Sequence, residues 1–422
     1  MMLNLALANK RNDCPLARFE QPIDRNKSKD LVMNRQYGVG IIGAGVVFKD
    51  HARAYQALAE RVKVIGISEI DPSKLDRATS EFFAPVATRD YHDLLRREDI
   101  DIVDICTPPQ LHREMVETAL EAGKVVICEK PMAQNLAEAD AIVGLAERFP
   151  NRVSVVFQLR YLPPVQKMIF LRDSGLLGRL HLAHFRRFAT FERQRQGMID
   201  WWGAWDTAGG GALMTQFIHN IDLLYYLLGP AVEVFGSMDT LVGDIQSEDT
   251  VAATIRFESG AIAQCISSLA SHSDENVLDL FGEQASVHYP WKLQAKDGRV
   301  RRALNRALLK QAPLTERVHL PSKADRLMEK VKRRLLGTPR PSSHTPYIRA
   351  VLDALDSGGE LPTQPLEARA SLEICAAIYT AALTGTTVSL PLDRTTPFYE
   401  GVSTSDYNGH DRFASRATAE GE

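Results

Sequence analysis

Between Tyr37 and Tyr161 the sequence alternates short runs rich in valine and isoleucine with stretches of helical periodicity. The apolar runs occupy residues 37–45, 62–68, 101–108, 124–131 and 152–161. Within them apolar residues follow one another instead of alternating with polar ones, which is typical of strands covered on both faces in a parallel sheet. Residues 111–123 have apolar side chains at helical spacing and end at Gly123, a helix stop. Repeated β–α units predict a doubly wound α/β sheet over residues 37–158.

After Arg160 the pattern changes to that of a second domain. The expected elements are a helix at 163–175, a strand at 179–192, a hairpin at 250–269, helices at about 346–357 and 366–384, and a final strand at 386–392. In the hairpin, Glu258, Ser259 and Gly260 separate two strand-like runs. We therefore expect an α+β domain over residues 159–392 with a largely antiparallel open sheet.

The length of 422 residues exceeds that of one ordinary core, in agreement with two domains. Residues 1–36 lack periodicity and are expected to be a disordered extension, and 393–422 a loose polar tail. The apolar stretch at 3–8 is too short for a signal peptide, and no run approaches a membrane span. Five cysteines without a Cys-x-x-Cys pair indicate a reducing compartment and no metal site. We expect a soluble, cytoplasmic protein.

One segment departs from the overall net charge of -3. Residues 292–341 hold 15 Lys or Arg against 4 Asp or Glu, a net charge of +11 that leaves -14 on the remainder. Within it, residues 323–336 form an amphipathic helical pattern. Three interpretations stay open: a solvated insertion, a helix on an anionic membrane surface, or the cover of a partner subunit. Nucleic acid is disfavoured, because no base-reading motif accompanies the charge.

A glycine-rich motif at residues 43–48 lies between the first strand and the following helix. Gly43 permits a tight turn, and Gly45 lets the backbone approach a pyrophosphate at the helix N-terminus. Phe48 stands where a third small residue is usual. The residues expected to contact a dinucleotide here are Gly43, Gly45, Val46 and Val47.

The second strand ends at Glu69, 26 residues past Gly43. A carboxylate in this place binds both ribose hydroxyls and repels a 2′-phosphate. Because Ile70 follows and offers no guanidinium for such a phosphate, the sequence favours NAD over NADP.

Two further motifs lie at strand ends, which are Thr107-Pro108-Pro109-Gln110-Leu111-His112 and Glu129-Lys130-Pro131. Ligands of open α/β sheets bind beyond the carboxyl ends of the strands. The residues expected at the cofactor crevice are therefore Thr107, Pro108, His112, Glu129 and Lys130. A lysine considered alone is more often a surface charge.

The last motif opens with three glycines, 209–211, that allow close approach of the backbone to a ligand. In the helix that follows, Thr215, His219 and Asp222 fall at i, i+4 and i+7, on one face. A single helical histidine is usually structural. Two polar neighbours on the same face of an otherwise apolar helix favour a functional site.

Together the three motifs at 107–112, 129–131 and 209–222 resemble the Gfo/Idh/MocA oxidoreductase family, which includes glucose–fructose oxidoreductase and inositol dehydrogenases. The similarity runs from about Gly38 to Leu392. It implies a Rossmann domain followed by an open-sheet domain whose outer face often forms dimers or tetramers. It also implies that Lys130 and His219 are catalytic. Relatives often carry an aspartate four residues before the histidine, where this chain has Thr215.

The expected reaction is hydride transfer between a carbinol carbon and a nicotinamide ring. A hydroxyl must lose its proton as the hydride leaves, which suits His219 as a base, with Lys130 stabilising the alkoxide charge. The flat rings of Trp205 and Tyr161 can pack on a pyranose, and Arg160 can bind a carboxylate or phosphate. Thr215, His219 and Asp222 complete the expected substrate site.

We therefore expect a sugar, cyclitol or nucleotide-sugar as substrate. Core or interface packing is an equal alternative for the tryptophans Trp201, Trp202 and Trp205. Two other functions stay open: a protein that senses a dinucleotide or sugar without turnover, and a glycoside hydrolase that uses NAD with no net redox change.

Overall fold

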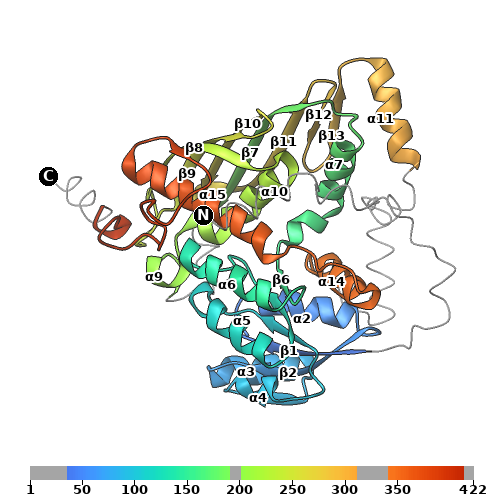
Figure 1. Ribbon diagram of the computed structural model, residues 1–422, viewed down its shortest axis with the longest axis vertical. Coiled ribbons are helices and arrows are strands. Elements are labelled where there is room, and N and C mark those ends of the chain that lie inside the picture. Colours follow the sequence, from blue (N-terminus) through green and yellow to red (C-terminus); the bar gives the residue numbers. More distant parts are fainter. Residues whose placement is uncertain (1–35, 191–200, 311–340, 413–422) are drawn as a thin grey trace. The chain divides into compact units, whose positions relative to one another are not determined.

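Six parallel strands in the order β3-β2-β1-β4-β5-β6 form the first sheet of the computed structural model, which describes residues 36–190, 201–310 and 341–412 (Figure 1). Its strands are β1 (Tyr37–Ile42), β2 (Val62–Ser68), β3 (Val86–Thr88), β4 (Ile102–Ile105), β5 (Val125–Cys128) and β6 (Val153–Val155). Its helices are α2 (Phe48–Ala57), α3 (Pro72–Phe82), α4 (His92–Leu95), α5 (His112–Glu121) and α6 (Leu136–Arg148). The doubly wound Rossmann sheet is confirmed; β3 alone falls outside the predicted runs.

Two hydrophobic clusters cover the two faces of this sheet and explain its continuous apolar runs. In β5, Val126 faces a cluster with side chains of α5 and α6, whereas Ile127 faces one with side chains of α2 and α3. Helix α14 (Thr345–Ser357), from late in the chain, joins the second cluster through Tyr347 and Val351. A distant segment of the chain therefore packs beside helix α2.

The second sheet has eight strands in the order β13-β12-β11-β7-β10-β9-β8-β14. They are β7 (Leu180–Thr190), β8 (Ala231–Asp239), β9 (Thr250–Phe257), β10 (Ile262–Ser268), β11 (Ala270–Gly282), β12 (Ala285–His288), β13 (Lys292–Ala295) and β14 (Val388–Ser389). All neighbours are antiparallel except β7 and β10, so the largely antiparallel sheet is confirmed. In β9 every second residue from Val251 to Phe257 is buried, which leaves the other face open.

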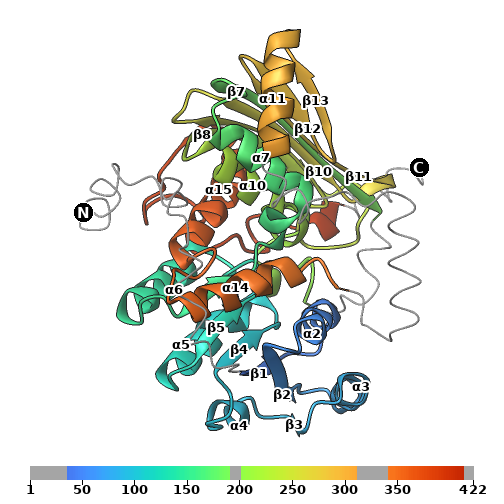
Figure 2. The same cartoon turned by 90° about the vertical axis from the view of Figure 1, so that its right-hand side faces the viewer.

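Helices pack on the buried face of this sheet (Figures 1 and 2). The main ones are α7 (Pro163–Asp173), α10 (Ile218–Leu228) and α15 (Pro365–Thr384). Short elements lie between the larger ones: η2 (Pro109–Leu111) precedes α5, η3 (Gln158–Tyr161) precedes α7, and α9 (Trp205–Ala208) with the π-helical turn η4 (Leu213–Phe217) precedes α10. One cluster contains both Val126 of β5 and Phe185 of β7, so a continuous core joins the two sheets.

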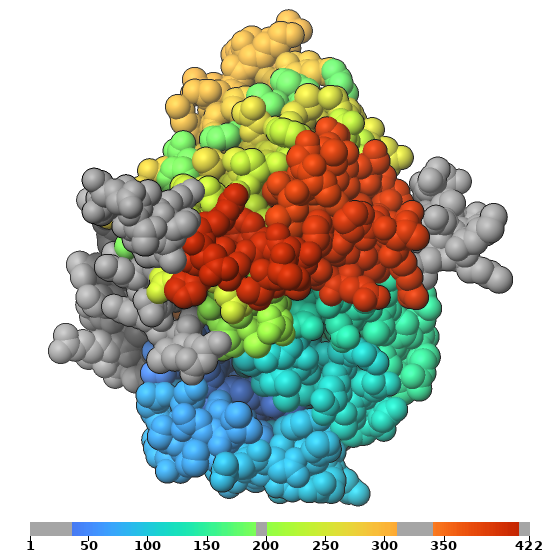
Figure 3. All heavy atoms as spheres, turned by 90° about the vertical axis from the view of Figure 1, so that its left-hand side faces the viewer, coloured from blue at the N-terminus to red at the C-terminus, as the bar shows by residue number. Residues whose placement is uncertain are grey.

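The predicted loose tail is wrong for residues 393–412. Tyr399 and Tyr407 are 5% and 8% exposed, and both belong to the main core cluster. The Tyr407 carbonyl accepts a hydrogen bond from the Trp205 indole at 2.9 Å. In Figure 3 the red C-terminal residues lie against the rest of the chain. Tyr399 and Tyr407 therefore anchor this otherwise polar segment to the core.

Part of the basic segment is ordered as β13 and helix α11 (Gly298–Lys310). Leu304 of α11 is fully buried, whereas Arg299, Arg301, Arg302 and Arg306 are exposed. The amphipathic stretch at 323–336 and the N-terminal residues 1–35 lie outside the described residues. Among the described helices, none is both long enough and apolar enough to span a membrane.

Candidate active site

The glycine-rich turn after β1 has the geometry of a phosphate-binding turn. Gly43 has φ +93°, and a Cβ there would lie 2.8 Å from the Cys106 carbonyl oxygen, so only glycine suits the position. The space beside Gly45 is open within 4 Å. Val47 precedes α2 without a side-chain cap, and the Val46 side chain is 56% exposed. Uncapped amides at an open helix N-terminus suit a pyrophosphate, so these residues fit a dinucleotide.

Glu69 follows β2 and lies beside this turn, as predicted. One carboxylate oxygen accepts a hydrogen bond from the Ala44 amide at 2.8 Å, and the other from the Asp71 amide at 3.0 Å. Each oxygen keeps a lone pair for a ribose hydroxyl.

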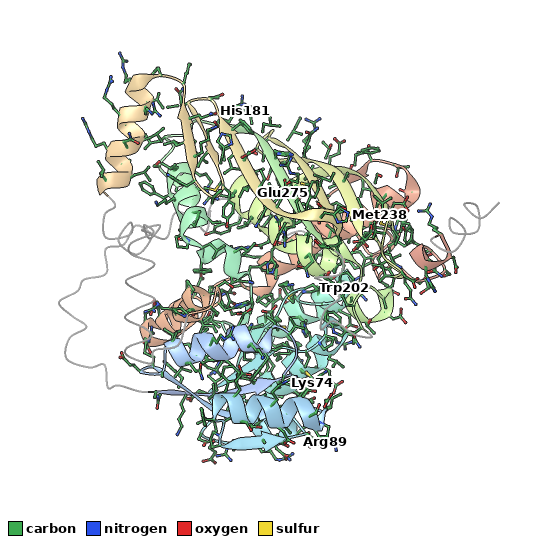
Figure 4. All side chains as sticks on the ribbon, turned by 180° about the vertical axis from the view of Figure 1, so that it is seen from behind. Lys74, Arg89, His181, Trp202, Met238 and Glu275 are labelled. Atoms are coloured by element: carbon green, nitrogen blue, oxygen red, sulfur yellow. The ribbon has the colours of Figure 1, made fainter. Side chains whose placement is uncertain are left out.

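Ile70 itself offers no guanidinium beside Glu69, but the fold brings one to it from another strand. Arg89 follows β3 (Figure 4), and its Nε donates to the carbonyl of Ile70, the residue after Glu69, at 3.1 Å. The pairing of Ser68 with Thr88 brings Arg89 to this place. The sequence analysis did not find Arg89 because β3, the strand that carries it to Ile70, has only three residues and no recognisable apolar run.

His112 is fully buried, with a backbone carbonyl at each ring nitrogen. Its Nδ1 lies 3.0 Å from the Pro131 carbonyl and its Nε2 lies 2.8 Å from the Thr107 carbonyl. Burial lowers its pKa, so one ring nitrogen donates at a time. His112 therefore ties the Thr107-Pro108 turn to the loop of Lys130, and a cofactor contact by this side chain stays a prediction that the geometry does not favour.

Lys130 links the two domains at the end of β5. Its Nζ donates to the carbonyl oxygen of Thr215 at 2.7 Å. Thr215 belongs to η4, and π turns leave backbone groups outside the regular helical ladder. Burial lowers the pKa of Lys130, and the Glu129 carboxylate opposes that shift.

His219 follows one turn later, at the start of α10. Among the described residues neither ring nitrogen has a hydrogen-bond partner, and Nδ1 is shut off from solvent. The ring packs edge-on against Phe157, with centroids 5.9 Å apart. Burial, helped by the positive charge of Lys130, holds the pKa of His219 well below its ordinary value of 6.5. A neutral imidazole with a free nitrogen can accept a proton.

Thr215 has its hydroxyl engaged on both sides. The Trp202 indole donates to Thr215 Oγ at 2.9 Å, and the hydroxyl donates to the Gly211 carbonyl at 2.6 Å. Trp202 (labelled in Figure 4) is 7% exposed. The Thr215 side chain therefore fixes the glycine run and an aromatic ring.

The glycine run packs against the protein itself, which corrects the expectation that it leaves room for a ligand. A Cβ on Gly209 would collide with the Gln134 carbonyl, and one on Gly211 with the Glu248 carbonyl. The buried Glu248 carboxylate accepts hydrogen bonds from the Gly211 amide at 3.0 Å and the Leu213 amide at 2.8 Å. Burial raises the pKa of Glu248 to about 7. No motif pointed to this residue.

Arg160 and Asp222 form a buried ion pair. The guanidinium makes two hydrogen bonds to Asp222, of 2.8 and 2.7 Å, and a third to Glu367 of 2.7 Å. Arg160 is 3% exposed and Asp222 1%. These contacts give both side chains a structural role, and substrate binding by them stays a prediction that the geometry does not favour.

The two predicted aromatic substrate residues also lie in packed surroundings. Trp205 is 2% exposed and stacks edge-on with Tyr379 and Tyr407, so the packing alternative is confirmed for it. Tyr161 is half-buried, with its ring edge-on to Tyr347 at 5.6 Å. Period and spacing do not distinguish an aromatic residue that lines a pocket from one that fills a core.

Comparisons with known proteins agree with this architecture. A family model described as "Oxidoreductase family, NAD-binding Rossmann fold" matches residues 37–157, and one described as "GFO/IDH/MocA C-terminal domain" matches residues 165–288. The chain is 30% identical over 261 residues to the uncharacterized oxidoreductase YrbE of Bacillus subtilis, which covers 60% of this chain and 74% of that protein.

Two further proteins with assigned names are similar over much of the chain. Levoglucosan dehydrogenase of Pseudarthrobacter phenanthrenivorans is 27% identical over 288 residues, covering 60% of this chain and 73% of that protein. The crystal structure of the WlbA dehydrogenase of Chromobacterium violaceum, in complex with NADH and UDP-GlcNAcA, has a TM-score of 0.70 and 26% identity. That match covers 86% of this chain and 98% of the other.

A Rossmann domain with an open glycine turn, joined to a second sheet that brings a histidine towards a strand-end lysine, is the architecture of an NAD-dependent dehydrogenase. The matched domains and the identity shared with YrbE are more specific. This chain belongs to the Gfo/Idh/MocA oxidoreductase family.

Proposed function

We propose that the protein transfers a hydride between NAD and a CH–OH group of a sugar, cyclitol or nucleotide-sugar. The observation that carries the proposal is the meeting of Lys130 and His219. Lys130 donates a hydrogen bond to the carbonyl oxygen of Thr215, which lies one helical turn before His219. The ring nitrogens of His219 have no hydrogen-bond partner among the described residues. NAD supplies the hydride acceptor or donor when it is bound at the turn of Gly43 and Gly45.

The two side chains divide the proton chemistry between them. His219 takes the hydroxyl proton as the carbon loses its hydride, because its neutral ring is held ready by the lowered pKa. Lys130 uses one N–H on the Thr215 carbonyl and keeps two for the substrate oxygen, where it stabilises the alkoxide charge.

Names of similar proteins support the substrate class. One relative is a levoglucosan dehydrogenase, and the WlbA structure holds UDP-GlcNAcA. The test is a panel of sugars, cyclitols and nucleotide-sugars with NAD, followed by NADH absorbance. Many turnovers on one class are expected. A single stoichiometric burst would indicate a sensor, and release of free sugar without an absorbance change would indicate a hydrolase.

The acid limb of kcat/KM for sugar oxidation should lie below pH 6.5. His219 is an active base only when neutral, and its lowered pKa keeps it neutral to a pH below the ordinary histidine value. The rate should therefore rise with pH through a limb below 6.5 and be level at pH 7. Rates from pH 5 to 9 check this, and a limb above 6.5 would contradict a neutral, desolvated His219.

We also propose a preference for NAD over NADP. Glu69 repels a 2′-phosphate, whereas Arg89 beside Ile70 attracts one. We therefore expect a moderate difference in affinity between NAD and NADP. NADH should bind more tightly than NADPH in fluorescence titrations, and Arg89→Ala should weaken NADPH further and leave NADH unchanged. Tighter binding of NADPH by the unmodified protein would overturn the preference.

A homo-oligomer formed through the open face of the second sheet completes the proposal. On that face Phe235 of β8 is 54% exposed, beside Thr254 of β9. An exposed aromatic side chain in a flat sheet suits contact with a second copy.

A further inference from the structure

A buried polar cluster lies directly behind the strand ends that carry Lys130. His51 of α2 places Nδ1 2.7 Å from the Asp104 carboxylate and Nε2 2.8 Å from the Glu129 carboxylate. Tyr55 also donates to Asp104, at 2.6 Å. His51 and Asp104 are fully buried and Glu129 is 4% exposed. A histidine with a carboxylate at each ring nitrogen is an imidazolium: burial opposes the charge, but Asp104 raises the pKa of His51 well above its ordinary value.

A second histidine reaches Glu129 from a distant part of the chain. His344, immediately before α14, places Nε2 3.5 Å from the same Glu129 oxygen that His51 contacts. This nitrogen is buried and makes no hydrogen bond among the described residues. The rings of His51 and His344 lie 4.5 Å apart. Glu129 is therefore flanked on one side by two imidazoles.

The other oxygen of Glu129 faces Lys130. It accepts the Lys130 amide hydrogen at 3.0 Å, so the carboxylate fixes the backbone that carries the lysine. The negative charge of Glu129 raises the pKa of Lys130, in opposition to burial, which lowers it. This charge offsets the desolvation of a buried ammonium. The pair has ionisable neighbours on each element packed against it, which are His51 and Tyr55 of α2, Asp104 of β4, Cys106 after β4, His112 of α5, Cys128 of β5, His219 of α10, His344 before α14 and Tyr347 of α14.

We propose that Glu129, clamped by His51 and His344, is the positioning residue that holds Lys130 in place and keeps its ammonium group charged. The inference rests on the proposed function, since it assumes that Lys130 contacts the reacting oxygen. Glu129 acts only through Lys130. Helix α14 thus contributes to the site through His344.

The same side chains are zinc ligand types, and Asp104 behind His51 resembles the outer carboxylate of a metal-bound histidine. Ligand atoms about 2.0–2.1 Å from a tetrahedral zinc stand roughly 3.3 Å apart. The 2.8 Å between His51 and Glu129 is a hydrogen-bond distance instead. The observations therefore favour an ionic cluster, and bound metal is one outcome of the test.

The test is Glu129→Gln, which keeps the size and an oxygen for the Lys130 amide but removes the charge. We expect kcat to fall about 10-fold or more and the basic limb of its pH profile to move down by about one unit, the scale for losing a nearby opposite charge. KM and NADH affinity should stay within about 3-fold. His51→Gln should move the limb in the same direction if Glu129→Gln does not fold.

Asp140→Asn is the matched control. Asp140 is also a nearly buried carboxylate in an ion pair, 2.6 Å from Arg369, but it belongs to α6 and, within the described part of the chain, makes no hydrogen bond or ion pair with Lys130. It should lower stability and leave the pH profile unchanged.

Three outcomes distinguish the positioning role of Glu129, the proposed function and a metal site. A normal pH profile and kcat in Glu129→Gln, with Lys130→Ala inactive, would overturn this inference alone. Normal turnover of Lys130→Ala would overturn the proposed function beneath it. One zinc per chain in the purified protein, lost in His344→Gln, would replace the ionic cluster by a metal site.

Discussion

Lys130→Ala and His219→Ala should each lower turnover at least about 100-fold, the usual scale for losing a positioned electrostatic or proton-transfer group. Without Lys130 the alkoxide charge loses the cation proposed to stabilise it. Without His219 the hydroxyl proton loses the neutral base proposed to accept it. NADH affinity should change far less in His219→Ala, because His219 belongs to the second domain. Steady-state rates and fluorescence titration measure both quantities.

Two controls test whether the loss is specific to these residues: a buried lysine that also donates to backbone carbonyls, and a half-buried histidine of the second sheet. Lys124 is 8% exposed and its Nζ donates to the carbonyls of Arg97 and Ile100 at 2.7 and 3.0 Å, at the amino end of β5. His288 of β12 is paired with Asp279 at 2.7 Å. Lys124→Ala and His288→Ala should keep turnover within a few-fold. Near-normal turnover of Lys130→Ala or His219→Ala would refute the role assigned to that residue.

The parallel sheet and the residues at its strand ends could be predicted from the sequence for a physical reason. Continuous apolar runs report burial on both faces, and a parallel sheet brings all carboxyl strand ends to one edge. The positions of Glu69 and Lys130 follow from this topology without any knowledge of their partners.

The predictions that the structure does not support concern side chains whose partners come from distant segments of the chain. Asp222 and His219 share a helix, yet Asp222 is taken by Arg160, 62 residues away, and by Ser371, 149 residues away. The glycines 209–211 carry no sign that Gln134 and Glu248 press against them. Helical spacing predicts which residues share a face but not what that face packs against.

The same reasoning explains why the buried cluster at His51 was not predicted. Its members come from α2, the ends of β4 and β5, and the residue before α14, so no window of the sequence contains two of its distant partners. Glu129 was predicted only as a cofactor neighbour. In the structure one of its carboxylate oxygens lies 2.8 Å from His51 Nε2.

Arg160→Met should lower the free energy of unfolding strongly, because it leaves the carboxylates of Asp222 and Glu367 without their cation. Breaking a buried pair by removing one partner costs about 3–5 kcal/mol in the free energy of unfolding. Methionine retains much of the side-chain length, so the loss reports charge and hydrogen bonds more than volume. Arg179→Met is the control: its partner Glu283 and Arg179 itself are largely exposed, and the cost there should stay below about 1 kcal/mol.

The loss in Arg160→Met should also depend on pH. Burial already raises the pKa of Asp222, and Arg160 opposes that shift, so without Arg160 the carboxyl should hold its proton to a still higher pH. An acid whose folded-state pKa is raised stabilises the fold at low pH and loses that contribution as pH rises. Denaturant unfolding should therefore show a smaller deficit at pH 5 than at pH 8. A stable Arg160→Met variant with KM raised for anionic sugars would instead restore Arg160 to the substrate site.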